Sequence, residues 1–388
     1  MTEAILVVNA GSSSIKCALH AAQAPHRRIG RAQVERIGGR PAWRSSRTPE
    51  APVPPEAGDH HAALIAWLLG RIERDFAEAS IVAAGHRVVH GGRDFTAPVR
   101  VTGAVRERLG ALVPLAPAHQ PHNLAGIAAL ETARPGLPQV ACFDTAFHRT
   151  QPRLAQIFAL PRALTDEGIL RYGFHGVSYE HIADVLPEHL GPCAEGRVIV
   201  AHLGHGASMC AMRGRRSVAT SMGFTALDGL VMGKRCGAVD PGVVLHLMRD
   251  RGMEVGQVEE LLGRRSGLLG VSGISDDMRD LLASDAPEAR EAVDLFVHRA
   301  VREIGALAAA LGGLDAIVFT AGIGEHCPPV RAGILEGCRW LGAELDPAAN
   351  EAGGPRIGTP GSAVAALVIP TDEERVIARH TAAVLAGA

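Results

Sequence analysis

A short segment near the N-terminus constrains the fold more than any other part of the chain. Residues 5–8 form an apolar, largely β-branched run, residues 9–14 form the polar turn Asn-Ala-Gly-Ser-Ser-Ser, and residues 15–19 form a second apolar run. This order predicts a strand, a tight turn and a second strand. Three later apolar runs also end in a glycine-rich or polar turn, at 198–203, 316–319 and 366–369. The sequence therefore predicts strands that repeatedly deliver a turn to one edge of a sheet.

Helical periodicity separates these strands. Residues 62–76 and 287–311 carry Ala, Leu and Val at spacings that fit a buried helical stripe. Strands that alternate with helices favour an α/β architecture. A chain of 388 residues is also too long for one ordinary core. We therefore expect two related lobes, with the Pro-rich stretch 52–55 at the surface of the first.

Composition removes several classes of function. The 39 basic and 41 acidic residues nearly cancel, so the chain has no global basic field to recruit nucleic acid or an anionic membrane. The seven cysteines are odd in number and form no Cys-x-x-Cys pair, which argues against a disulfide framework or a thiolate zinc site. The N-terminus shows no cationic lead followed by a long apolar run. These features predict a soluble cytoplasmic protein whose partners are small molecules.

The segment Asn9–Lys16 is a candidate phosphate-binding turn. It combines one glycine, three serines, an amide and a lysine between two predicted strands. Backbone N–H groups and short polar side chains in such a turn suit the oxygens of a phosphate. A hairpin turn without a ligand has the same composition, so the composition alone leaves both interpretations open.

Residues 85–92, Gly-His-Arg-Val-Val-His-Gly-Gly, place Arg87 between His86 and His90. The guanidinium is permanently charged and can bind a carboxylate or a phosphate through two parallel hydrogen bonds. Two histidines four residues apart can also bind a metal ion, but a strand does not present them on one face as a helix does. The segment therefore favours Arg87 as an anion-binding residue over a zinc site.

Other glycine-rich segments exclude two common nucleotide folds. Residues 222–237 bring Lys234 and Arg235 together, but they lack the Walker A spacing and the Ser or Thr after the lysine. No Gly-x-Gly-x-x-Gly follows the first predicted strand, so a dinucleotide fold is not supported. Asp144 and His175 stand among aromatic residues and glycines in a chain with only 4% aromatics. A structural role is the alternative to a catalytic one for both.

Ten segments resemble motifs of the acetate kinase family and follow one another in the family's order. They are 9–16, 86–92, 114–119, 143–148, 172–176, 202–208, 220–237, 266–272, 319–325 and 370–374. The resemblance implies an α/β fold of two duplicated actin/ribonuclease-H-like lobes, each with a β-β-β-α-β-α-β-α core, around a central cleft. It implies an N-terminal lobe of residues 1–146 and 374–388, and a nucleotide-binding C-terminal lobe of residues 147–373.

The resemblance also implies roles for individual residues. The implied catalytic group is Arg87, His119, Asp144, His175 and Arg235. The implied nucleotide-binding residues are Lys16, His202, Leu203, Gly204, His205, Gly206, Asp277, Met278, Arg279, Gly322, Ile323, Gly324, Glu325 and His326. The implied pocket for the acid is Arg87, Val89, Ala118, Phe174 and Ala226. The implied metal-site residues are Asn9 and Glu373.

The activity that the resemblance implies is that of an acetate kinase. Such an enzyme transfers a phosphoryl group reversibly and in line between ATP and acetate, giving acetyl phosphate and ADP, with Mg²⁺ or alternatively Mn²⁺, and works as a homodimer. The acid, with a pKa of about 4–5, is already ionised at neutral pH and needs no strong base. The difficulty is that this anion must approach a negatively charged triphosphate. Cationic side chains and a metal ion offset that repulsion. Asp144 would orient Arg87 or the metal shell.

Several positions depart from the family pattern. Ala118 and Ala226 stand where leucine and proline are usual, and they enlarge the expected acid pocket. Each additional buried methylene is worth about 0.8 kcal/mol, which makes a propionate or butyrate kinase the alternative. His205 and His326 replace asparagines beside the expected nucleotide. Lys234, where threonine is common, would strengthen phosphate binding or point to solvent.

The alternative from a different class of function is a nucleotide-dependent switch. An actin-like or chaperone-like protein uses ATP to switch its binding to partners, without a small-molecule acceptor. Such a switch has no reason to carry an acid-pocket set of Arg87, Val89, His119 and Phe174. A degenerate enzyme that only binds ligands is weakened because every charged catalytic position is present. The sequence therefore favours a carboxylate kinase.

Overall fold

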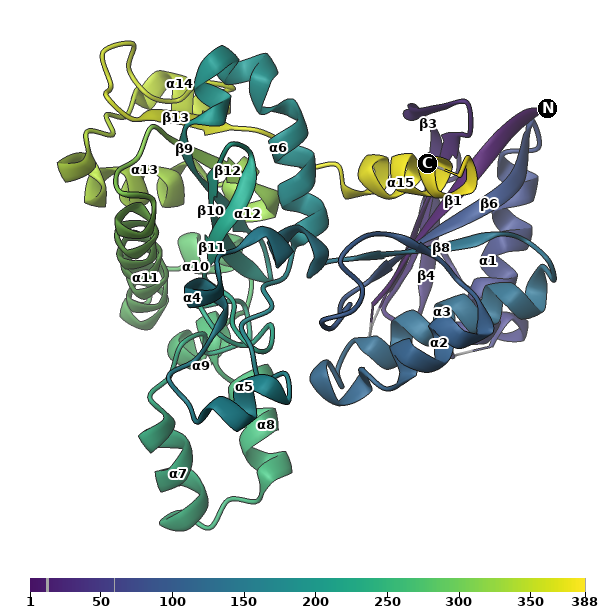
Figure 1. Cartoon of the computed structure of the whole chain (residues 1–388), viewed down its shortest axis with the longest axis horizontal. Helices are drawn as coiled ribbons and strands as arrows, with labels where there is room; N and C mark the ends of the chain where they lie inside the picture. Colours follow the sequence, from purple (N-terminus) through teal and green to yellow (C-terminus); the bar gives the residue numbers. More distant parts are fainter. Residues whose placement is uncertain (12–13, 59, 388) are drawn as a thin grey trace. The chain divides into compact units, whose positions relative to one another are not determined.

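The structure, a computed structural model, describes residues 1–11, 14–58 and 60–387. Ser12 and Ser13 of the predicted phosphate turn lie outside the described residues. The chain divides into two compact units, shown with their elements in Figure 1. Unit 1 is Met1–Phe147 with Asp372–Ala388, and unit 2 is His148–Thr371. The lobe boundaries given above, at 146 and 373, stay a prediction, and the two units are described separately below.

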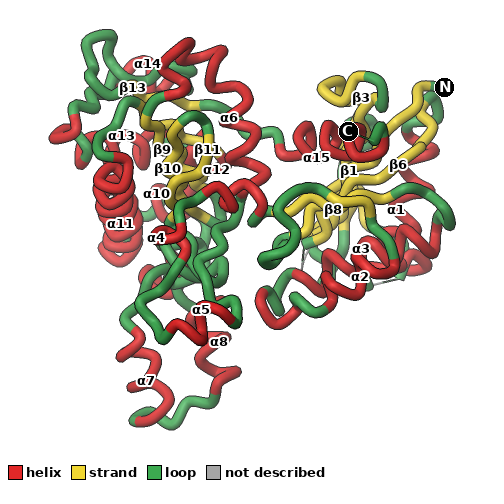
Figure 2. The backbone as a smooth tube through the Cα atoms, viewed as in Figure 1, coloured by secondary structure: helices red, strands yellow, loops and turns green. Residues whose placement is uncertain are grey.

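Unit 1 is built on a sheet of order β5-β4-β3-β2-β1-β6-β8-β7, whose strands are yellow in Figure 2. The strands are β1 (Thr2–Ala10), β2 (Ser14–Ala21), β3 (Ala24–Glu35), β4 (Ala42–Ser45), β5 (Ala51–Pro52), β6 (Ala79–Val88), β7 (Val99–Arg100) and β8 (Gln139–Phe143). β1, β2 and β3 are antiparallel neighbours. β6 runs parallel to β1, and β8 runs parallel to β6.

Unit 2 repeats this order in a sheet β11-β10-β9-β12-β13. Its strands are β9 (Arg197–Leu203), β10 (Ala207–Arg213), β11 (Arg216–Thr220), β12 (Ala316–Thr320) and β13 (Ala365–Val368). β9, β10 and β11 are antiparallel, and β12 joins β9 and β13 in parallel pairs. Each sheet thus has a core order 3-2-1-4-5, which confirms the predicted duplicated α/β fold.

Helices cover both sheets. Those of unit 1 are α1 (His61–Asp75), α2 (Gly103–Gly110), α3 (Gln120–Ala133) and α15 (Glu373–Leu385). Those of unit 2 are α4 (Arg153–Gln156), α5 (Arg162–Asp166), α6 (Gly176–Leu190), α7 (Pro241–Arg249), α8 (Val255–Arg264), α9 (Gly267–Ser272), α10 (Met278–Leu282), α11 (Pro287–Leu311), α12 (Ala321–His326), α13 (Pro328–Gly337) and α14 (Pro347–Ala352). The predicted helices 62–76 and 287–311 are α1 and α11.

The apolar periodicity of these elements makes the core. Leu64 and Leu68, one helical turn apart on α1, pack in one cluster with Leu6 and Val8 of β1. Leu6 and Val8 share a face because side chains alternate along a strand. A helix that crosses a membrane needs about 20 apolar residues, and the described part of the chain contains no such helix.

We predict that Gly85→Ala destabilises unit 1. A Cβ at Gly85 on β6 would lie 2.2 Å from Oγ1 of Thr381 and 2.7 Å from Cγ2 of Ile377, both on α15. The methyl group would push the closing helix off the sheet, and overpacking of this kind costs about 1–3 kcal/mol. The free energy of unfolding from urea titration measures the effect.

Gly70→Ala is the matched control. Gly70 lies in the middle of α1, and a Cβ there would meet no atom within 4 Å. Alanine should stabilise the helix by about 0.5–1 kcal/mol. Equal stability of the Gly85 variant and the wild type would show that α15 does not depend on this close approach.

Candidate active site

An ion pair between Arg87 and Asp144 forms the centre of the candidate site in unit 1. Arg87 lies near the end of β6, and Asp144 follows the last residue of β8. Nε of Arg87 donates to Oδ1 of Asp144 at 2.9 Å, and Nη2 donates to Oδ2 at 2.5 Å. The Asp144 side chain is only 2% exposed. Two parallel charge-assisted hydrogen bonds therefore fix the guanidinium in one orientation.

The strand register brings these two residues together. β6 and β8 run parallel, with Arg87 opposite Cys142 and Val88 opposite Phe143. The backbone N–H of Asp144 then donates to the carbonyl of Val88 at 3.1 Å. Because parallel strands end at the same edge of a sheet, residues 57 positions apart in the sequence become neighbours.

A second carboxylate, Glu373 in the first turn of α15, lies 3.8 Å from Nε of Arg87. Burial alone would lower the pKa of Arg87, but the carboxylates of Asp144 and Glu373 outweigh burial and raise that pKa. Arg87 therefore stays charged at every physiological pH.

Two arginines of β3 hold the carboxylates on either side of Glu373. Nη2 of Arg28 donates to Asp372 at 3.1 Å and Nη1 donates to Glu374 at 3.3 Å. Nε of Arg31 donates to Glu374 at 2.7 Å. With both flanking carboxylates engaged at β3, the intervening Glu373 side chain lies toward β6.

Asn9 and Glu373 offer oxygen donors to a metal ion. Asn9 on β1 follows Val8, which pairs with His86 on β6, so Asn9 lies at the same sheet edge as Arg87. Amide and carboxylate oxygens are ligands that Mg²⁺ accepts. Among the described residues, no cluster of three or more His, Cys, Asp or Glu could hold a metal ion. The two residues therefore fit Mg²⁺ that takes its other ligands from water and phosphate.

The other predicted residues of unit 1 lie next to the ends of these strands. His119 immediately precedes α3, and Val89 follows β6 and is 7% exposed. Ala118 is exposed, and Lys16 is an exposed residue of β2 opposite Asn9. Asn9 and Lys16 thus flank the turn between β1 and β2.

In unit 2 the predicted residues His175 and His202 form a stacked pair. His175 precedes α6 with a left-handed φ of 58°, a conformation that few residues other than glycine adopt. Its ring stacks on that of His202 at 4.2 Å between centroids. Nδ1 of His175 lies 2.8 Å from the hydroxyl of Ser208, and Nδ1 of His202 lies 2.8 Å from the hydroxyl of Ser178. These contacts fix both rings.

Gly206 lies beside two of the predicted catalytic residues, His175 and Arg235. A Cβ built on Gly206 would lie 3.4 Å from Nε2 of His175 and 3.8 Å from Nη1 of Arg235. Nη1 of Arg235 donates to the carbonyl of Ala226 at 3.0 Å. The bare backbone of Gly206 therefore leaves room for an anion beside both side chains. Phe174, expected in the acid pocket, is 2% exposed.

His205 and Lys234 share one carboxylate. Nε2 of His205 lies 2.7 Å from Oδ2 of Asp276, and Nζ of Lys234 lies 3.5 Å from the same oxygen. Burial alone would raise the pKa of Asp276, but the hydrogen bond with His205 and the charge of Lys234 outweigh it and lower that pKa. Lys234 thus forms an ion pair, which neither expectation for this residue had included.

Two of the segments expected to bind the nucleotide, 277–279 and 322–326, are held by different contacts. Asp277 caps α10 by accepting from the N–H of Arg279 at 2.9 Å, and Nη2 of Arg279 donates to Oδ2 of Asp277 at 2.5 Å. The hydrogen bond with Arg279 is the main reason that the pKa of Asp277 falls to about 2. Met278 between them is buried.

The second segment, Gly322–His326, forms most of α12. Oε1 of Glu325 accepts from the N–H of Ala321 at 2.8 Å and from the N–H of Thr371 at 3.2 Å. Glu325 therefore ties the start of α12 to the chain after β13. His326 is 81% exposed, and its Nε2 lies 3.9 Å from Oε2 of Glu325.

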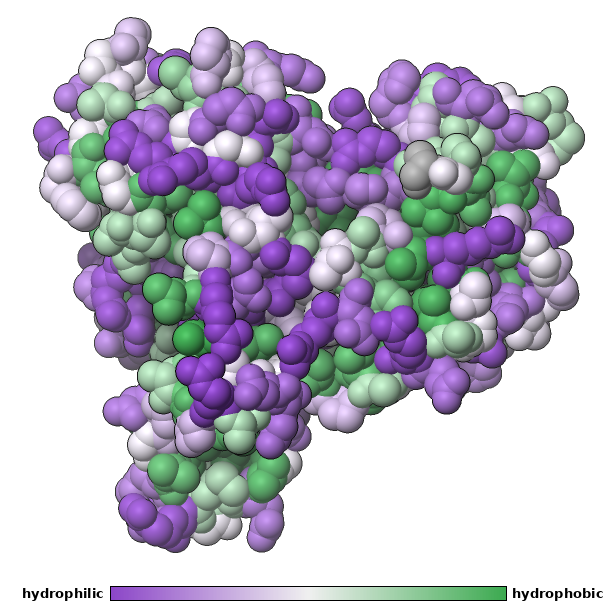
Figure 3. Space-filling view, viewed as in Figure 1, coloured by the Kyte–Doolittle hydropathy of each residue, from purple (hydrophilic) through white to green (hydrophobic). Residues whose placement is uncertain are grey.

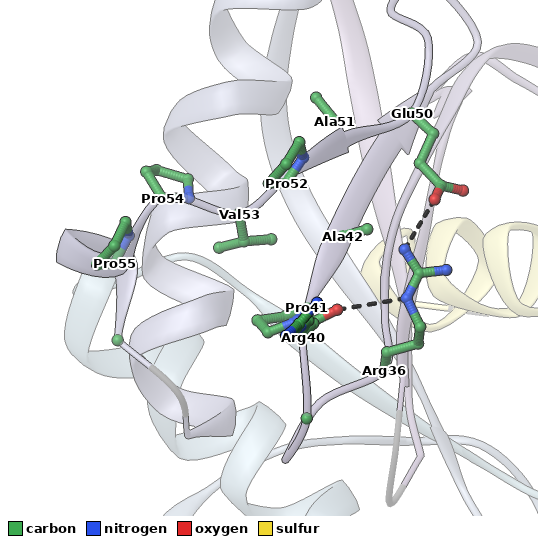
Figure 4. A pocket seen from close by; sticks show the side chains of 12 residues that line it. Arg36, Arg40, Pro41, Ala42, Glu50, Ala51, Pro52, Val53, Pro54 and Pro55 are labelled. Carbon is green, nitrogen blue, oxygen red and sulfur yellow. Dashed lines mark hydrogen bonds and ion pairs between the residues drawn. The ribbon is translucent and has the colours of Figure 1, made fainter.

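Two other features of unit 1 do not belong to this site. His86 lies 2.7 Å from Oε1 of Gln139, and burial lowers the pKa of His86 to about 4 against this hydrogen bond. His86 therefore serves the core as a neutral ring. A surface pocket of about 960 Å³ lies beside the Pro-rich stretch 52–55 (Figure 4). Its Arg36 donates to Glu50 at 2.7 Å, and its described lining contains no residue of the predicted site.

Several residues that support the site carry no recognisable pattern in the sequence. Arg331 is fully buried and donates to the carbonyls of Gly324 and Glu325 at the end of α12, at 3.0 and 2.9 Å. Burial lowers the pKa of Arg331. Asn123 on α3 is likewise buried and bonds the backbone of Ala10, at the end of β1, and of Val89, just after β6. A single polar residue in the sequence gives no local sign of such a role.

The duplicated fold, with arginines and histidines at the ends of its strands, defines the class of actin-like phosphotransferases that use a carboxyl group as acceptor. Within that class the chain belongs to the acetate kinase family, because the family model described as "Acetokinase family" matches residues 4–379. An acetate kinase of Rhodopseudomonas palustris is 55% identical over 98% of this chain and 98% of its own length. ATP and a carboxylate are the substrates of this family.

Two solved structures agree with this assignment. The acetate kinase of Porphyromonas gingivalis has a TM-score of 0.88 and 35% identity, with 99% of this chain and 100% of that chain covered. A propionate kinase of Francisella tularensis has a TM-score of 0.90 and 35% identity, with 98% and 99% covered. The fold is thus common to relatives named for two different acids.

We predict that Gly206→Ala weakens turnover without weakening the fold. The new methyl group would make ordinary contacts with His175 and Arg235 and occupy the space that an anion needs. A displacement of about 1 Å in a bound phosphate can lower turnover on the order of 100-fold. Steady-state kinetics with a melting curve measures both quantities.

Gly263→Ala is the control for this experiment. Gly263 lies in α8, where an added Cβ would meet no atom within 4 Å. Its turnover should match the wild type. Wild-type turnover in the Gly206 variant would mean that no anion binds beside His175 and Arg235.

Proposed function

We propose that this protein is an acetate kinase that transfers a phosphoryl group reversibly between ATP and acetate, giving acetyl phosphate and ADP. The observation that carries the proposal is the ion pair of Arg87 with the buried Asp144. A guanidinium has five N–H donors, and Asp144 takes two of them. The remaining donors can grip a small carboxylate and hold it for attack.

The reaction forms one bond between a carboxylate oxygen and the γ-phosphorus and breaks the bond between that phosphorus and the oxygen of ADP. The acid is ionised at neutral pH, so no proton has to be removed. The barrier comes from repulsion between anions and from charge on the transferring group. We propose that Arg87 binds the acid, that Arg235 and His175 bind equatorial phosphoryl oxygens, and that His119 binds a further oxygen.

Mg²⁺, or Mn²⁺ in its place, would be held by Asn9 and Glu373 and would neutralise charge on the phosphates. The protein itself would contribute the side-chain oxygens of Asn9 and Glu373, at the same sheet edge as Arg87. The ion pairs of Arg28 and Arg31 with the neighbours of Glu373 support that presentation. The backbone of Gly204–Gly206, after β9, is proposed to contact the phosphates.

We predict that purified protein with Mg-ATP converts acetate to acetyl phosphate, trapped as the hydroxamate. Arg87→Ala should lower turnover on the order of 100-fold or more, because the acid loses its cation and Asp144 is left buried without it. Arg87→Lys should recover only part of the activity, since an ammonium cannot form the two-pronged contact with Asp144. The rate of hydroxamate formation is the measurement.

A panel of acids from two to five carbons decides between acetate and a longer substrate. Ala118 and Ala226 favour the alternative, a propionate or butyrate kinase, because small side chains leave room in the expected pocket. A higher kcat/KM for acetate supports the proposal, and a higher value for propionate or butyrate supports the alternative. No product with any acid, together with full activity of the Arg87→Ala variant in ATP hydrolysis, would reject both.

We also propose that the protein is a homodimer that uses α7 and α8 of unit 2. None of the residues of α7, all of which the structure describes, is buried. Val243 and Leu245 on α7 and Val255 on α8 are 46%, 60% and 60% exposed. Apolar side chains are visible among polar ones over these helices (Figure 3). An exposed apolar surface of this kind is typical of a protein interface.

We predict a solution mass of twice the chain mass of 40.6 kDa, measured by light scattering after gel filtration. Leu245→Glu with Val255→Glu should shift the protein toward the monomer, because a charge buried in an interface is costly. Leu154→Glu is the control, since Leu154 is 85% exposed on α4. A doubly substituted protein that remains a dimer would place the interface elsewhere.

A further inference from the structure

The backbones of β1 and β6 separate at the edge of the sheet where the predicted site lies. The parallel pairing of these strands ends with Val8 opposite His86. Beyond that point β1 continues to Ala10 as a partner of β2, whereas β6 ends at Val88. The N–H of Val89 and the carbonyl of Ala10 thus lie past the end of the shared ladder, where buried backbone groups need other partners.

The side-chain amide of Asn123 supplies both partners. Oδ1 of Asn123 accepts from the N–H of Val89 at 3.0 Å, and Nδ2 donates to the carbonyl of Ala10 at 2.8 Å. The amide can make both hydrogen bonds in only one orientation, because the N–H of Val89 needs an acceptor and the carbonyl of Ala10 needs a donor. Asn123 is 4% exposed, so water does not readily replace these bonds.

The position of Asn123 on α3 connects it to a third part of the site. Its own N–H donates to the carbonyl of His119 at 3.2 Å. Gly126, one turn further on, brings the helix close to the turn, since a Cβ there would lie 3.3 Å from the Cβ of Ala10. Gln120, on the same face of α3, repeats the device: its amide accepts from the N–H of His90 at 3.2 Å and donates to the carbonyl of His90 at 3.1 Å.

We propose that Asn123 is a positioning residue that holds the end of β1, with Asn9 and Ala10, and the Arg87–Val89 segment at a fixed separation. The inference rests on the proposed function, in which Asn9 serves the metal and nucleotide and Arg87 and Val89 serve the acid. One amide therefore connects the two substrate-binding halves of unit 1. Its two hydrogen bonds can be removed separately, so its role can be distinguished from a general contribution to stability.

Asn123→Asp separates the two bonds. An ionised aspartate still accepts from the N–H of Val89, but it presents an oxygen to the carbonyl of Ala10 and repels it. The end of β1, which carries Asn9, should shift, while Val89 keeps its hydrogen bond to residue 123. We expect the Kd for Mg-ADP by calorimetry and the KM for Mg-ATP to rise about tenfold, with the KM for acetate changing less than about threefold.

Asn123→Ala removes both hydrogen bonds. It is a second test of the proposal that does not depend on the folding of the aspartate variant. Here the Kd for Mg-ADP and the KM for acetate should both rise about tenfold. Gln139→Leu is the matched control, because Gln139 is a buried amide of unit 1 that bonds His86 and the carbonyl of Ile127 at the opposite end of β8. It should lower the melting temperature and leave both constants near the wild type.

The outcomes separate this inference from the proposed function. If the wild type makes no acyl phosphate, the proposed function fails, while calorimetry with Mg-ADP still tests Asn123. If both Asn123 variants melt early but bind Mg-ADP and acetate as the Gln139 control does, Asn123 is only structural and the inference fails. An equal rise of both constants in Asn123→Asp would also overturn it, because one intact bond should protect the acid side.

Discussion

The parallel pairing of the first and fourth core strands is the constraint on which both units depend. In unit 1 it places Val8 opposite His86, and in unit 2 it places His202 opposite Thr320. Parallel strands end at one edge, so the turns that follow them meet there. A slip of one residue would reverse the face of every side chain on the strand. The same holds for the neighbouring pair β6 and β8, whose register brings Arg87 to Asp144, because a slip there would take this cation away from a buried carboxylate.

The features that were predictable from the sequence are those with a local pattern. The buried stripe at 287–311 coincides with α11, and the apolar run at 5–8 lies inside β1, which extends to Thr2–Ala10. The pairing of Asp144 with Arg87 was one of two alternatives that the family resemblance implied, but no local pattern predicts it, because it follows from the register of β6 and β8. Asn123 was missed, since an asparagine in a helix becomes informative only when two strands separate beside it.

Charge at the start of α15 shows how neighbouring residues support one another. Asp372, Glu373 and Glu374 are consecutive carboxylates at a helix N-terminus, where the helix dipole favours negative charge but the charges repel each other. Arg28 and Arg31 take the outer two, and Arg87 lies near the middle one. Each ion pair is partly exposed and contributes modestly to stability. Their combined effect is mainly to orient the carboxylates, since Asp372 and Glu374 are held at β3 and Glu373 lies toward β6.

Each unit uses a different kind of side chain to join the ends of neighbouring core strands, β1 and β6 in unit 1 and β12 and β13 in unit 2. In unit 1 the amide of Asn123 joins the ends of β1 and β6 through Ala10 and Val89. In unit 2 the carboxylate of Glu325 joins the end of β12 to the chain after β13, and Arg331 holds the carbonyls at the end of α12. An amide can both donate and accept, so it suits one N–H and one carbonyl, whereas a carboxylate suits two N–H groups. The duplication is therefore visible in the strand order but not in the side chains that join the strand ends. Each of those side chains matches the N–H and carbonyl groups that the strands of its own unit leave without a partner in the sheet.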